Sequence, residues 1–191
     1  MGVPRTPREA WIEQGLRTLA GNGVDAVRVE VLAKALGVTK GGFYGYFADR
    51  GALLEAMLDT WERESVDEVL EHIAHEQDPR AKVVLAGRLT LSDDRLLSID
   101  LAVRDWARRD DAVAERLRRV DDRRMDVLRE AIGTFCTDPD EIEARSLLAF
   151  CLAIGLHFLG ADHKGRTREE VRARASSIIL DSAQRPDGTA R

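Results

Sequence analysis

Apolar residues return every three or four positions along most of the chain, and this spacing predicts α-helices. In the first such segment the apolar face consists of Trp11, Ile12, Gly15, Leu16 and Leu19. The chain holds only 5 prolines and few runs of β-branched residues, which argues against an all-β fold. We therefore predict an all-α protein.

Capping residues and glycines divide this pattern into about nine helices. The sequences Thr6–Glu9 and Thr167–Glu170 have the form of capping boxes, in which a threonine and a glutamate satisfy each other's backbone N–H groups. The other predicted N-caps are Asp49, Asp78, Ser92, Asp93, Asp110 and Asp138. The predicted helices cover about residues 7–21, 28–36, 39–46, 50–75, 79–91, 93–108, 111–134, 139–160 and 168–183.

The segment from Val27 to Leu58 has the pattern of a helix-turn-helix. Ala33 is small enough for a second helix to cross closely, Gly37 stands where the turn requires positive φ, and Phe43 returns to the shared core. The second helix, from about Thr39 to Tyr46, would present its exposed face to a DNA major groove. The pattern predicts a DNA-binding protein with a three-helix N-terminal domain.

The distribution of charge suggests two functional parts. The net charge of the chain is −5, but residues 1–50 hold 7 basic and 5 acidic residues, whereas the remainder holds 22 and 29. A weakly basic head on an acidic body suits a DNA-reading domain joined to a regulatory one. The arginine-rich run Arg116–Glu130 contains interleaved acids, so we interpret it as a solvated helix face with i,i+4 ion pairs. We predict a DNA-binding domain over residues 1–50, an effector-binding and dimerisation domain over 51–185, and a disordered tail over 186–191.

The sequence LAKALGVTKGGFYGYFADRGALLEAML, residues 32–58, resembles the TetR family of one-component transcriptional regulators. The resemblance rests on a Leu-Ala pair, a Gly-Val-Thr turn, a Tyr-x-x-Phe step and a basic residue that opens the next helix. It covers roughly the first quarter of the chain, and the rest agrees in length and helical character. The chain departs from the family at Arg28, where a threonine is usual, and at Gly42, where Thr, Ser or Ala is commoner.

The start of the predicted recognition helix supplies the first candidates for DNA contact. The hydroxyl of Thr39 can cap the helix or meet a phosphate, and both alternatives stay open. Lys40, Gly41 and Gly42 form the first turn, where two glycines disfavour an α-helix by ~1 kcal/mol each. Close approach of the backbone to DNA would explain them, and so would a short segment that orders only on DNA.

Two tyrosines end the recognition helix. Phe43 and Phe47 are four residues apart and share a buried face, so Tyr44 should project toward the groove and Tyr46 toward the DNA backbone. The family resemblance implies phosphate contacts for both tyrosines. Packing of the rings with solvated hydroxyls is the alternative.

Arg28 and Arg50 are further phosphate candidates. Each opens a helix, where the helix dipole disfavours a cation and a nearby phosphate would relieve the conflict. Arg50 resembles the family's lysine at this position, which reaches phosphate. A solvated surface charge is the alternative for each arginine.

The resemblance also implies that the body helices enclose a pocket for a small effector. The candidate pocket residues are Trp61, Leu89, Ile99, Asp100, Val103, Trp106, Phe150 and His157. Asp100 and His157 lie on otherwise apolar segments, where a polar group costs energy unless it is paired. Ordinary core packing is the alternative for every member of the set. An aromatic, weakly polar pocket would favour a hydrophobic effector.

A homodimer is expected because one head reads only a few base pairs and two-fold symmetry matches a palindromic site. The last two long helices, about 139–160 and 168–183, would form a four-helix bundle across the two-fold axis. The predicted dimer contacts are Ala149, Ala153, Leu156, Ala175, Ile178 and Ile179.

The sequence shows no catalytic or metal-binding pattern. It lacks a glycine-rich phosphate loop, a Gly-x-Ser-x-Gly elbow and a cluster of His, Cys and Asp. Cys136 and Cys151 lie in apolar contexts, as free thiols in a reducing cytosol do, and no segment reaches the ~18 apolar residues of a membrane span. We therefore predict no catalytic residues, no metal, no cofactor, no membrane contact and a cytoplasmic protein.

These observations favour a regulator that binds a palindromic operator on double-stranded DNA as a dimer. We expect a repressor that a small hydrophobic effector releases from DNA, because the effector favours a state with the wrong spacing of heads. An effector-free architectural DNA-binding protein and a transcriptional activator are the alternatives. A helical enzyme would need a polar cluster in the body, which the sequence lacks.

Overall fold

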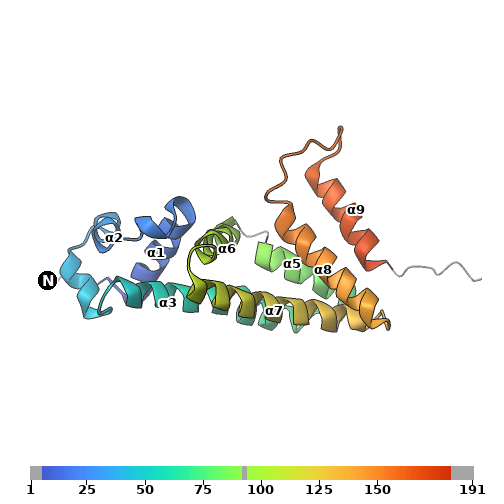
Figure 1. Ribbon diagram of the computed structural model, residues 1–191, viewed down its shortest axis with the longest axis horizontal. Helices are drawn as coiled ribbons and strands as arrows, with labels where there is room; N and C mark the ends of the chain where they lie inside the picture. The colour runs from blue at the N-terminus through green and yellow to red at the C-terminus, as the bar shows by residue number, and fades with distance from the viewer. Residues whose placement is uncertain (1–5, 92–93, 182–191) are drawn as a thin grey trace, which may run out of the picture. The chain divides into compact units, whose positions relative to one another are not determined.

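The computed structural model describes residues 6–91 and 94–181, and these residues form helices and turns without any strand (Figure 1). Nine α-helices follow one another along the described chain, together with two short 3₁₀ helices and one π turn. The predicted all-α fold is confirmed. The predicted cap at Ser92 and Asp93 and the predicted tail 186–191 lie outside the described residues.

The N-terminal part alternates helices with short 3₁₀ segments. It consists of α1 (Arg8–Asn22), η1 (Val24–Ala26), α2 (Val29–Leu36), η2 (Lys40–Gly45) and α3 (Arg50–Glu62). The π turn η3 (Arg63–Asp67) then continues α3 into α4 (Glu68–Ile73). The remaining helices are α5 (Pro79–Leu91), α6 (Asp94–Ala107), α7 (Asp111–Gly133), α8 (Pro139–Gly155) and α9 (Arg168–Leu180).

Hydrogen bonds at the helix starts confirm most of the predicted caps. Asp49 Oδ1 accepts from the Ala52 N–H at 2.8 Å, and Thr167 and Glu170 form the predicted reciprocal box. The first predicted box is wrong, because Pro7 takes the extended N-cap conformation of α1 and no side chain caps that helix. Thr6 therefore lies one residue before the N-cap of α1.

Three segments differ from the predicted α-helices. The recognition segment is a 3₁₀ helix, in keeping with two glycines in its first turn that disfavour the α conformation. The helix predicted over 50–75 contains the π turn and ends at Ile73, and the helix predicted over 139–160 ends at Gly155. Glycine again accounts for the early end, since it is the poorest helix former after proline.

The chain divides into two compact units. Unit 1 contains Met1–Glu71 and Thr90–Asp122, and unit 2 contains His72–Leu89 and Arg123–Arg191. Residues of the predicted head therefore share a packing unit with α3, α6 and the first half of α7. A functional division near residue 50 stays a prediction.

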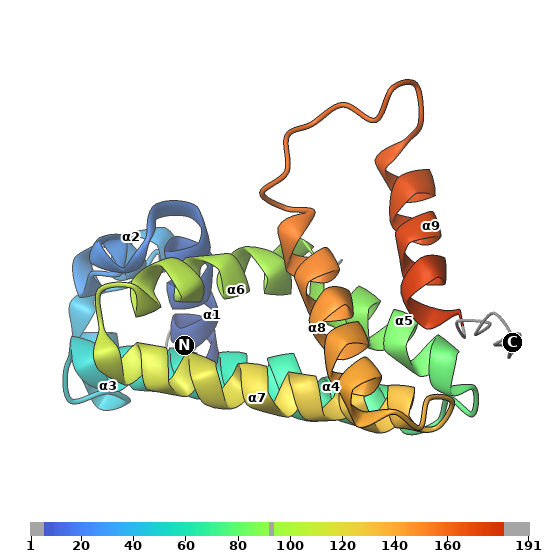
Figure 2. The same cartoon turned by 45° about the vertical axis from the view of Figure 1, so that its right-hand side comes forward.

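Unit 1 has an aromatic and aliphatic core. α1 packs against α2, α3 and α6, as the two views show (Figures 1 and 2). The largest fully buried side chains of this core are Trp11, Leu16, Leu19, Leu32, Phe43, Leu53, Met57, Leu58, Trp61 and Ile99. Gly15 permits a close approach of α1 to α3, because a Cβ there would lie 2.6 Å from Met57 Sδ.

Unit 2 has a smaller core. Its buried residues are Val83, Leu128, Ala131, Ile132 and Leu180. α8 packs against α9 within this unit.

The helix-turn-helix forms as its sequence predicts. Ala33 is buried in α2, and Gly37 ends that helix with φ 67°, in the left-handed region. The Val38 N–H then donates to Ala33 O at 2.9 Å, which closes the turn. Phe43 is fully buried, so all three positions that indicated the motif are confirmed.

The arginine-rich run on α7 is only partly the solvated face that its sequence predicts. Arg118 pairs with Asp122, and Arg119 with Glu115, both at i,i+4 spacing. The side chain of Arg116 is only 15% exposed, because it reaches across to a column of carboxylates on one face of α3. Its partners are Glu55, Asp59 and Glu62.

Candidate nucleic-acid interface

The recognition segment η2 is attached to unit 1 through one aromatic side. Phe43 packs edge-on against Trp11 with ring centroids 5.4 Å apart and stacks on Phe47 at 5.2 Å. Phe43 and Phe47 are both buried. The opposite side of η2 is left at the surface of the unit.

The exposed side of η2 carries most of the residues predicted to contact DNA. Thr39, Lys40 and Gly41 are exposed, and Tyr44 is 60% exposed with its ring edge against Phe43. Thr39 occupies the N-cap position in extended conformation, but its side chain makes no capping hydrogen bond. Of the two alternatives for Thr39, capping is therefore not formed in this structure, and the hydroxyl remains a candidate for phosphate.

Lys40 has an acidic partner that the sequence did not reveal. Its Nζ lies 2.6 Å from Glu30 Oε1, on α2. This hydrogen-bonded contact raises the pKa of Lys40 and lowers the pKa of Glu30. The two residues are ten positions apart across a turn, a spacing that carries no signal in the sequence. A phosphate that approaches Lys40 must compete with Glu30.

Packing within the chain does not require the two glycines of η2. A Cβ at Gly41 would have Thr39 Oγ1 as its nearest neighbour at 3.8 Å, and one at Gly42 would lie 3.8 Å from Trp11 Cζ2. Both distances are ordinary van der Waals contact. Close approach to DNA stays a prediction for both positions.

Tyr46 and Arg28 lie beside this surface in different environments. Tyr46 is half-buried and packs against the core of unit 1. Arg28 is exposed at the N-cap of α2, where its Nε donates to Asp25 O at 3.0 Å. Arg28 is thus the more accessible of the two.

Arg50 makes internal contacts that the sequence did not predict. It is the first residue of α3, and its Nε donates to Val27 O and its Nη2 to Val24 O, each at 2.6 Å. Both carbonyls belong to the connection between α1 and α2. Arg50 therefore ties the start of α3 to the start of the helix-turn-helix.

Five of the predicted effector contacts lie together in the core of unit 1. Trp61, Ile99, Asp100, Val103 and Trp106 are all buried there. Trp61 Nε1 donates to Asp100 Oδ1 at 3.2 Å, and Arg104 Nε donates to Asp100 Oδ2 at 2.9 Å. The structure therefore gives Asp100 the role of a satisfied core residue.

Arg104 extends this buried polar group to a third helix. It donates from both Nη atoms to Asp121 on α7, at 2.8 and 2.7 Å. Burial opposes its charge, but the carboxylates of Asp121 and Asp100 outweigh burial and raise the pKa of Arg104. The cluster joins α3, α6 and α7 within unit 1.

The other effector candidates belong to unit 2. Leu89 and Phe150 are half-buried, and His157 is exposed. A groove of about 650 Å³ lies in the same unit, but it contains none of these three residues. Its lining residues come from α5, from α9 and from the residue after α9: Arg80, Val84, Arg88, Glu169, Arg172, Ala173, Ser176, Ser177, Leu180 and Asp181.

The predicted dimer contacts on α8 and α9 divide between inward and outward positions. Ala149 and Ile179 pack against the core of unit 2, whereas Ile178 is 64% exposed. The half-buried members are Ala153, Leu156 and Ala175. Four further large apolar residues are about half exposed or more: Leu147 and Leu148 on α8, and Phe158 and Leu159 after its end. They lie in the apolar run LLAFCLAIGLHFL.

Metal sites and membrane spans are both absent from the described residues. No group of three or more His, Cys, Asp or Glu side chains within residues 6–91 and 94–181 has the arrangement of a metal site. None of the helices in those ranges combines the length and the apolar character needed to cross a bilayer.

The helix-turn-helix is also the part of the chain that matches a known family. Residues 12–57 match the model described as "Bacterial regulatory proteins, tetR family". The N-terminal domain belongs to the TetR family. The match runs from Ile12 in α1 to Met57 in α3 and includes α2 and η2, so the resemblance drawn from residues 32–58 is confirmed for this TetR-family domain.

Solved structures of similar fold cover nearly the whole chain. A transcriptional regulator from Saccharomonospora viridis in complex with choline has a TM-score of 0.70 and 19% identity over 90% of this chain and 94% of its own. FadR from Bacillus subtilis in complex with stearoyl-CoA has a TM-score of 0.67 and 13% identity over 92% and 98%. AibR in complex with isovaleryl coenzyme A and operator DNA has a TM-score of 0.66 and 14% identity over 90% and 97%. No curated protein matches the sequence.

Arg50 and Lys40 allow an internal role to be separated from a DNA contact, since Arg50→Gln and Lys40→Gln remove the same charge from the head. Arg50→Gln should lower the free energy of unfolding by about 2 kcal/mol, because two carbonyls lose a charged donor. It should leave the salt dependence of DNA binding unchanged. Lys40→Gln should barely change stability and should reduce the slope of log K against log salt by about 1. A reduced slope in Arg50→Gln would contradict the internal role.

Proposed function

We propose that this TetR-family protein is a repressor that binds a palindromic operator as a homodimer and is released by a small hydrophobic effector. The exposed face of η2, held on a buried aromatic anchor, is the observation that carries the proposal. Thr39, Lys40, Gly41 and Tyr44 supply a hydroxyl, an ammonium, an unobstructed backbone and a phenol on one surface. These are groups that contact phosphates and base edges in a major groove.

The charge of the head supports DNA as its partner. Residues 1–50 carry an excess of basic residues, although the chain as a whole is acidic. Arg28 lies exposed at the start of α2 and adds a guanidinium beside the helix-turn-helix. The proposed DNA contacts are therefore Arg28, Thr39, Lys40, Gly41, Gly42, Tyr44 and Tyr46, with Arg50 acting chiefly through the backbone carbonyls that it holds.

Selection from random duplexes tests DNA binding directly. The full-length protein should enrich a palindromic motif, and affinity for it should fall steeply with salt as phosphate contacts release counterions. Tyr44→Phe should weaken binding by ~1 kcal/mol, the scale of one hydrogen bond, without a change in melting temperature. If the wild-type protein enriches no palindromic motif, the proposed function is refuted.

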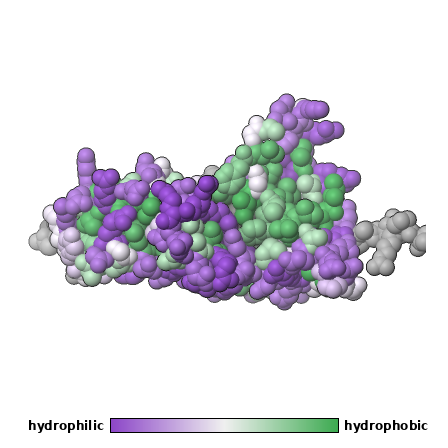
Figure 3. All heavy atoms as spheres, in the orientation of Figure 1, coloured by the Kyte–Doolittle hydropathy of each residue, from purple (hydrophilic) through white to green (hydrophobic). Residues whose placement is uncertain are grey.

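Exposed apolar side chains on α8, just after α8 and on α9 support a second copy of this chain as the partner. Leu147, Leu148, Phe158, Leu159 and Ile178 are all roughly half exposed or more. Figure 3 shows apolar surface gathered over this part of unit 2. A monomer rarely exposes a contiguous apolar patch of this kind, and a palindromic site requires two heads.

The variant Leu148→Glu tests the proposed dimer, and Val84→Glu is its control. Leu148→Glu places a charge in the proposed interface, where burial without a partner is costly, so the protein should elute as a monomer in size-exclusion chromatography with light scattering. Val84→Glu, on α5, adds the same charge at a similarly exposed apolar position of unit 2 and should leave the dimer intact. A dimeric Leu148→Glu would place the interface elsewhere.

The effector proposal is supported by the ligands of proteins with the same fold. The structures reported above hold choline, isovaleryl coenzyme A and stearoyl-CoA, and the last two carry apolar acyl chains. In this chain Leu89 and Phe150 are half-buried apolar residues of unit 2, and they are the proposed apolar contacts. Trp61, Ile99, Asp100, Val103 and Trp106 pack with one another in the core of unit 1.

A thermal-shift screen followed by DNA binding tests the effector. The panel contains choline, isovaleryl coenzyme A, stearoyl-CoA and free fatty acids of increasing length. A compound that stabilises the state unable to bind DNA should raise the melting temperature and weaken operator binding together, since both follow from one linkage. Compounds that stabilise the protein and leave operator affinity unchanged would contradict the proposed coupling.

A reporter gene under control of the operator distinguishes a repressor from an activator. If transcription of the reporter falls when the protein is absent, the protein is an activator.

A further inference from the structure

Buried residues continue from α3 through the π turn that follows it. Met57, Leu58 and Trp61 are buried on α3, and Ser65, Val66, Val69 and Ile73 are buried after it. Ser65 stands four positions after Trp61, a step that keeps one face on an α-helix, and Val66 stands one position further. Both residues are buried in the wider π turn.

Burial of the Ser65 side chain in the π turn costs free energy. Ser65 is 1% exposed, and its Oγ has no hydrogen-bond partner in the described part of the chain. A buried hydroxyl without a partner destabilises the segment that contains it. The π turn is therefore a weak point in the helix that begins directly after the recognition segment.

An ion pair within the turn depends on its geometry. Arg63 and Glu68 pair although they are five residues apart. In an α-helix two such positions would differ by about 140° around the axis and would not face each other. The pair therefore forms because the π turn brings the two side chains onto one side.

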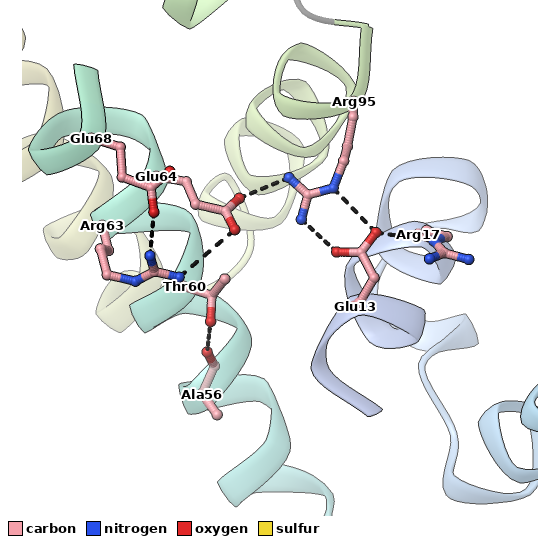
Figure 4. Close-up of polar contacts among 8 residues, drawn as sticks. All are labelled: Glu13, Arg17, Ala56, Thr60, Arg63, Glu64, Glu68 and Arg95. Carbon is pink, nitrogen blue, oxygen red and sulfur yellow. Dashed lines mark hydrogen bonds and ion pairs between the residues drawn. The ribbon is translucent and has the colours of Figure 1, made fainter. Parts of the chain in front are cut away.

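Arg95 connects this turn to α1 from the neighbouring helix α6 (Figure 4). Its Nη1 donates to Glu64 Oε2, in the π turn, at 2.8 Å. Its Nε donates to Glu13 Oε1, on α1, at 3.1 Å, and Nη2 donates to the second oxygen of Glu13. The hydrogen-bonded contact with the Arg95 guanidinium lowers the pKa of Glu13.

The α1 end of this contact lies two residues from the anchor of the recognition segment. Trp11 packs edge-on against Phe43, and a Cβ at Gly42 would lie within van der Waals distance of its ring. A displacement of α1 relative to α3 therefore moves the surface on which η2 rests. Glu13, where Arg95 holds α1, is thus coupled to η2 through the body of α1 itself.

We propose that Arg95 is a positioning residue for DNA binding, which fixes the orientation of η2 by tying α1 to the π turn. The inference rests on the proposed DNA-binding function. Arg95 itself touches no DNA in this proposal. One of its charged contacts is with Glu64 in the weak π turn and the other is with Glu13 on α1, and a loss of these contacts lets α1 and η2 shift together.

The test measures the affinity of the full-length protein for one duplex carrying the palindrome enriched by the wild type. Arg95→Gln should bind it about five-fold more weakly, the upper range for a partly exposed ion-pair group. The salt slope should remain that of the wild type, because no phosphate contact is lost. Arg118→Gln is the matched control, since it removes the same charge and the same kind of ion pairs but within α7 alone, and it should bind as the wild type does.

Glu64→Gln separates positioning from general electrostatics. Removal of an acid should strengthen binding to DNA if charge alone matters, whereas loss of the Arg95 contact should weaken it. A double variant, Arg95→Gln with Glu64→Gln, should bind no more weakly than Arg95→Gln alone, because Arg95→Gln already removes the contact that Glu64→Gln removes. Hydrogen exchange of the amides in residues 40–45 should accelerate in both single variants and remain unchanged in Arg118→Gln.

Each outcome points to a different conclusion. A wild-type protein that binds no duplex refutes the proposed function, and this inference with it. A wild-type protein that binds, together with Arg95→Gln and Glu64→Gln variants of undiminished affinity, refutes the positioning role alone. A salt slope that falls by about 1 in Arg95→Gln would instead assign Arg95 a direct phosphate contact. Should Arg95→Gln fail to fold by circular dichroism, Glu64→Gln carries the test.

Discussion

The exposed surface of η2 is held in place by the burial of Phe43 against Trp11. The segment η2 is a six-residue 3₁₀ helix with two glycines in its first turn, too short and too poor in helix formers to persist alone. Two glycines disfavour it by about 2 kcal/mol relative to alanine. Burial of one phenylalanine contributes about 2–3 kcal/mol. Burial of Phe43 therefore outweighs the cost of the glycine-rich backbone. The segment η2 can keep a fixed position on unit 1 and a backbone that side chains do not obstruct.

Guanidinium groups from other helices fix α3, the helix that follows this surface. Arg116 on α7 contacts a column of carboxylates, Arg104 joins Asp100 and Asp121 beside Trp61, and Arg95 reaches the π turn. Ion pairs that are partly buried add little net stability, but they disfavour other registers, because a charge moved away from its partner would be left desolvated. The acidic character of residues after 50 thus serves packing within unit 1 as well as the surface charge of the chain.

Local signals predicted the parts of the fold that depend on few residues. Ala33, Gly37 and Phe43 each answer one steric requirement of the helix-turn-helix, so the motif could be recognised without knowledge of the rest. The π turn could not be found in this way, because the buried positions Trp61 and Ser65 keep a step of four residues. The carbonyl contacts of Arg50 and the pair of Lys40 with Glu30 could not, because each joins residues that only the tertiary fold brings together.

The effector candidates show why composition cannot separate a pocket from a core. Trp61, Ile99 and Val103 are candidates because they are large and apolar, and the same property makes them pack against one another. Asp100 is a candidate because it is an isolated polar group in the sequence, yet the residue four positions later, Arg104, and the indole of Trp61 satisfy it. A ligand site requires side chains that leave an unfilled space between them. The spacing of residues along a helix indicates which way each residue faces, but it does not indicate whether the space in front of it is filled.

The pair of Lys40 with Glu30 adds a constraint on how the head distinguishes among anions. An exposed ion pair contributes little to stability, so a phosphate can displace Glu30 with little loss. That cost is the same for an isolated phosphate and for a duplex, but a duplex can offset it through the other contacts proposed for Tyr44 and Thr39. An acid beside the recognition segment is therefore compatible with the proposed DNA binding.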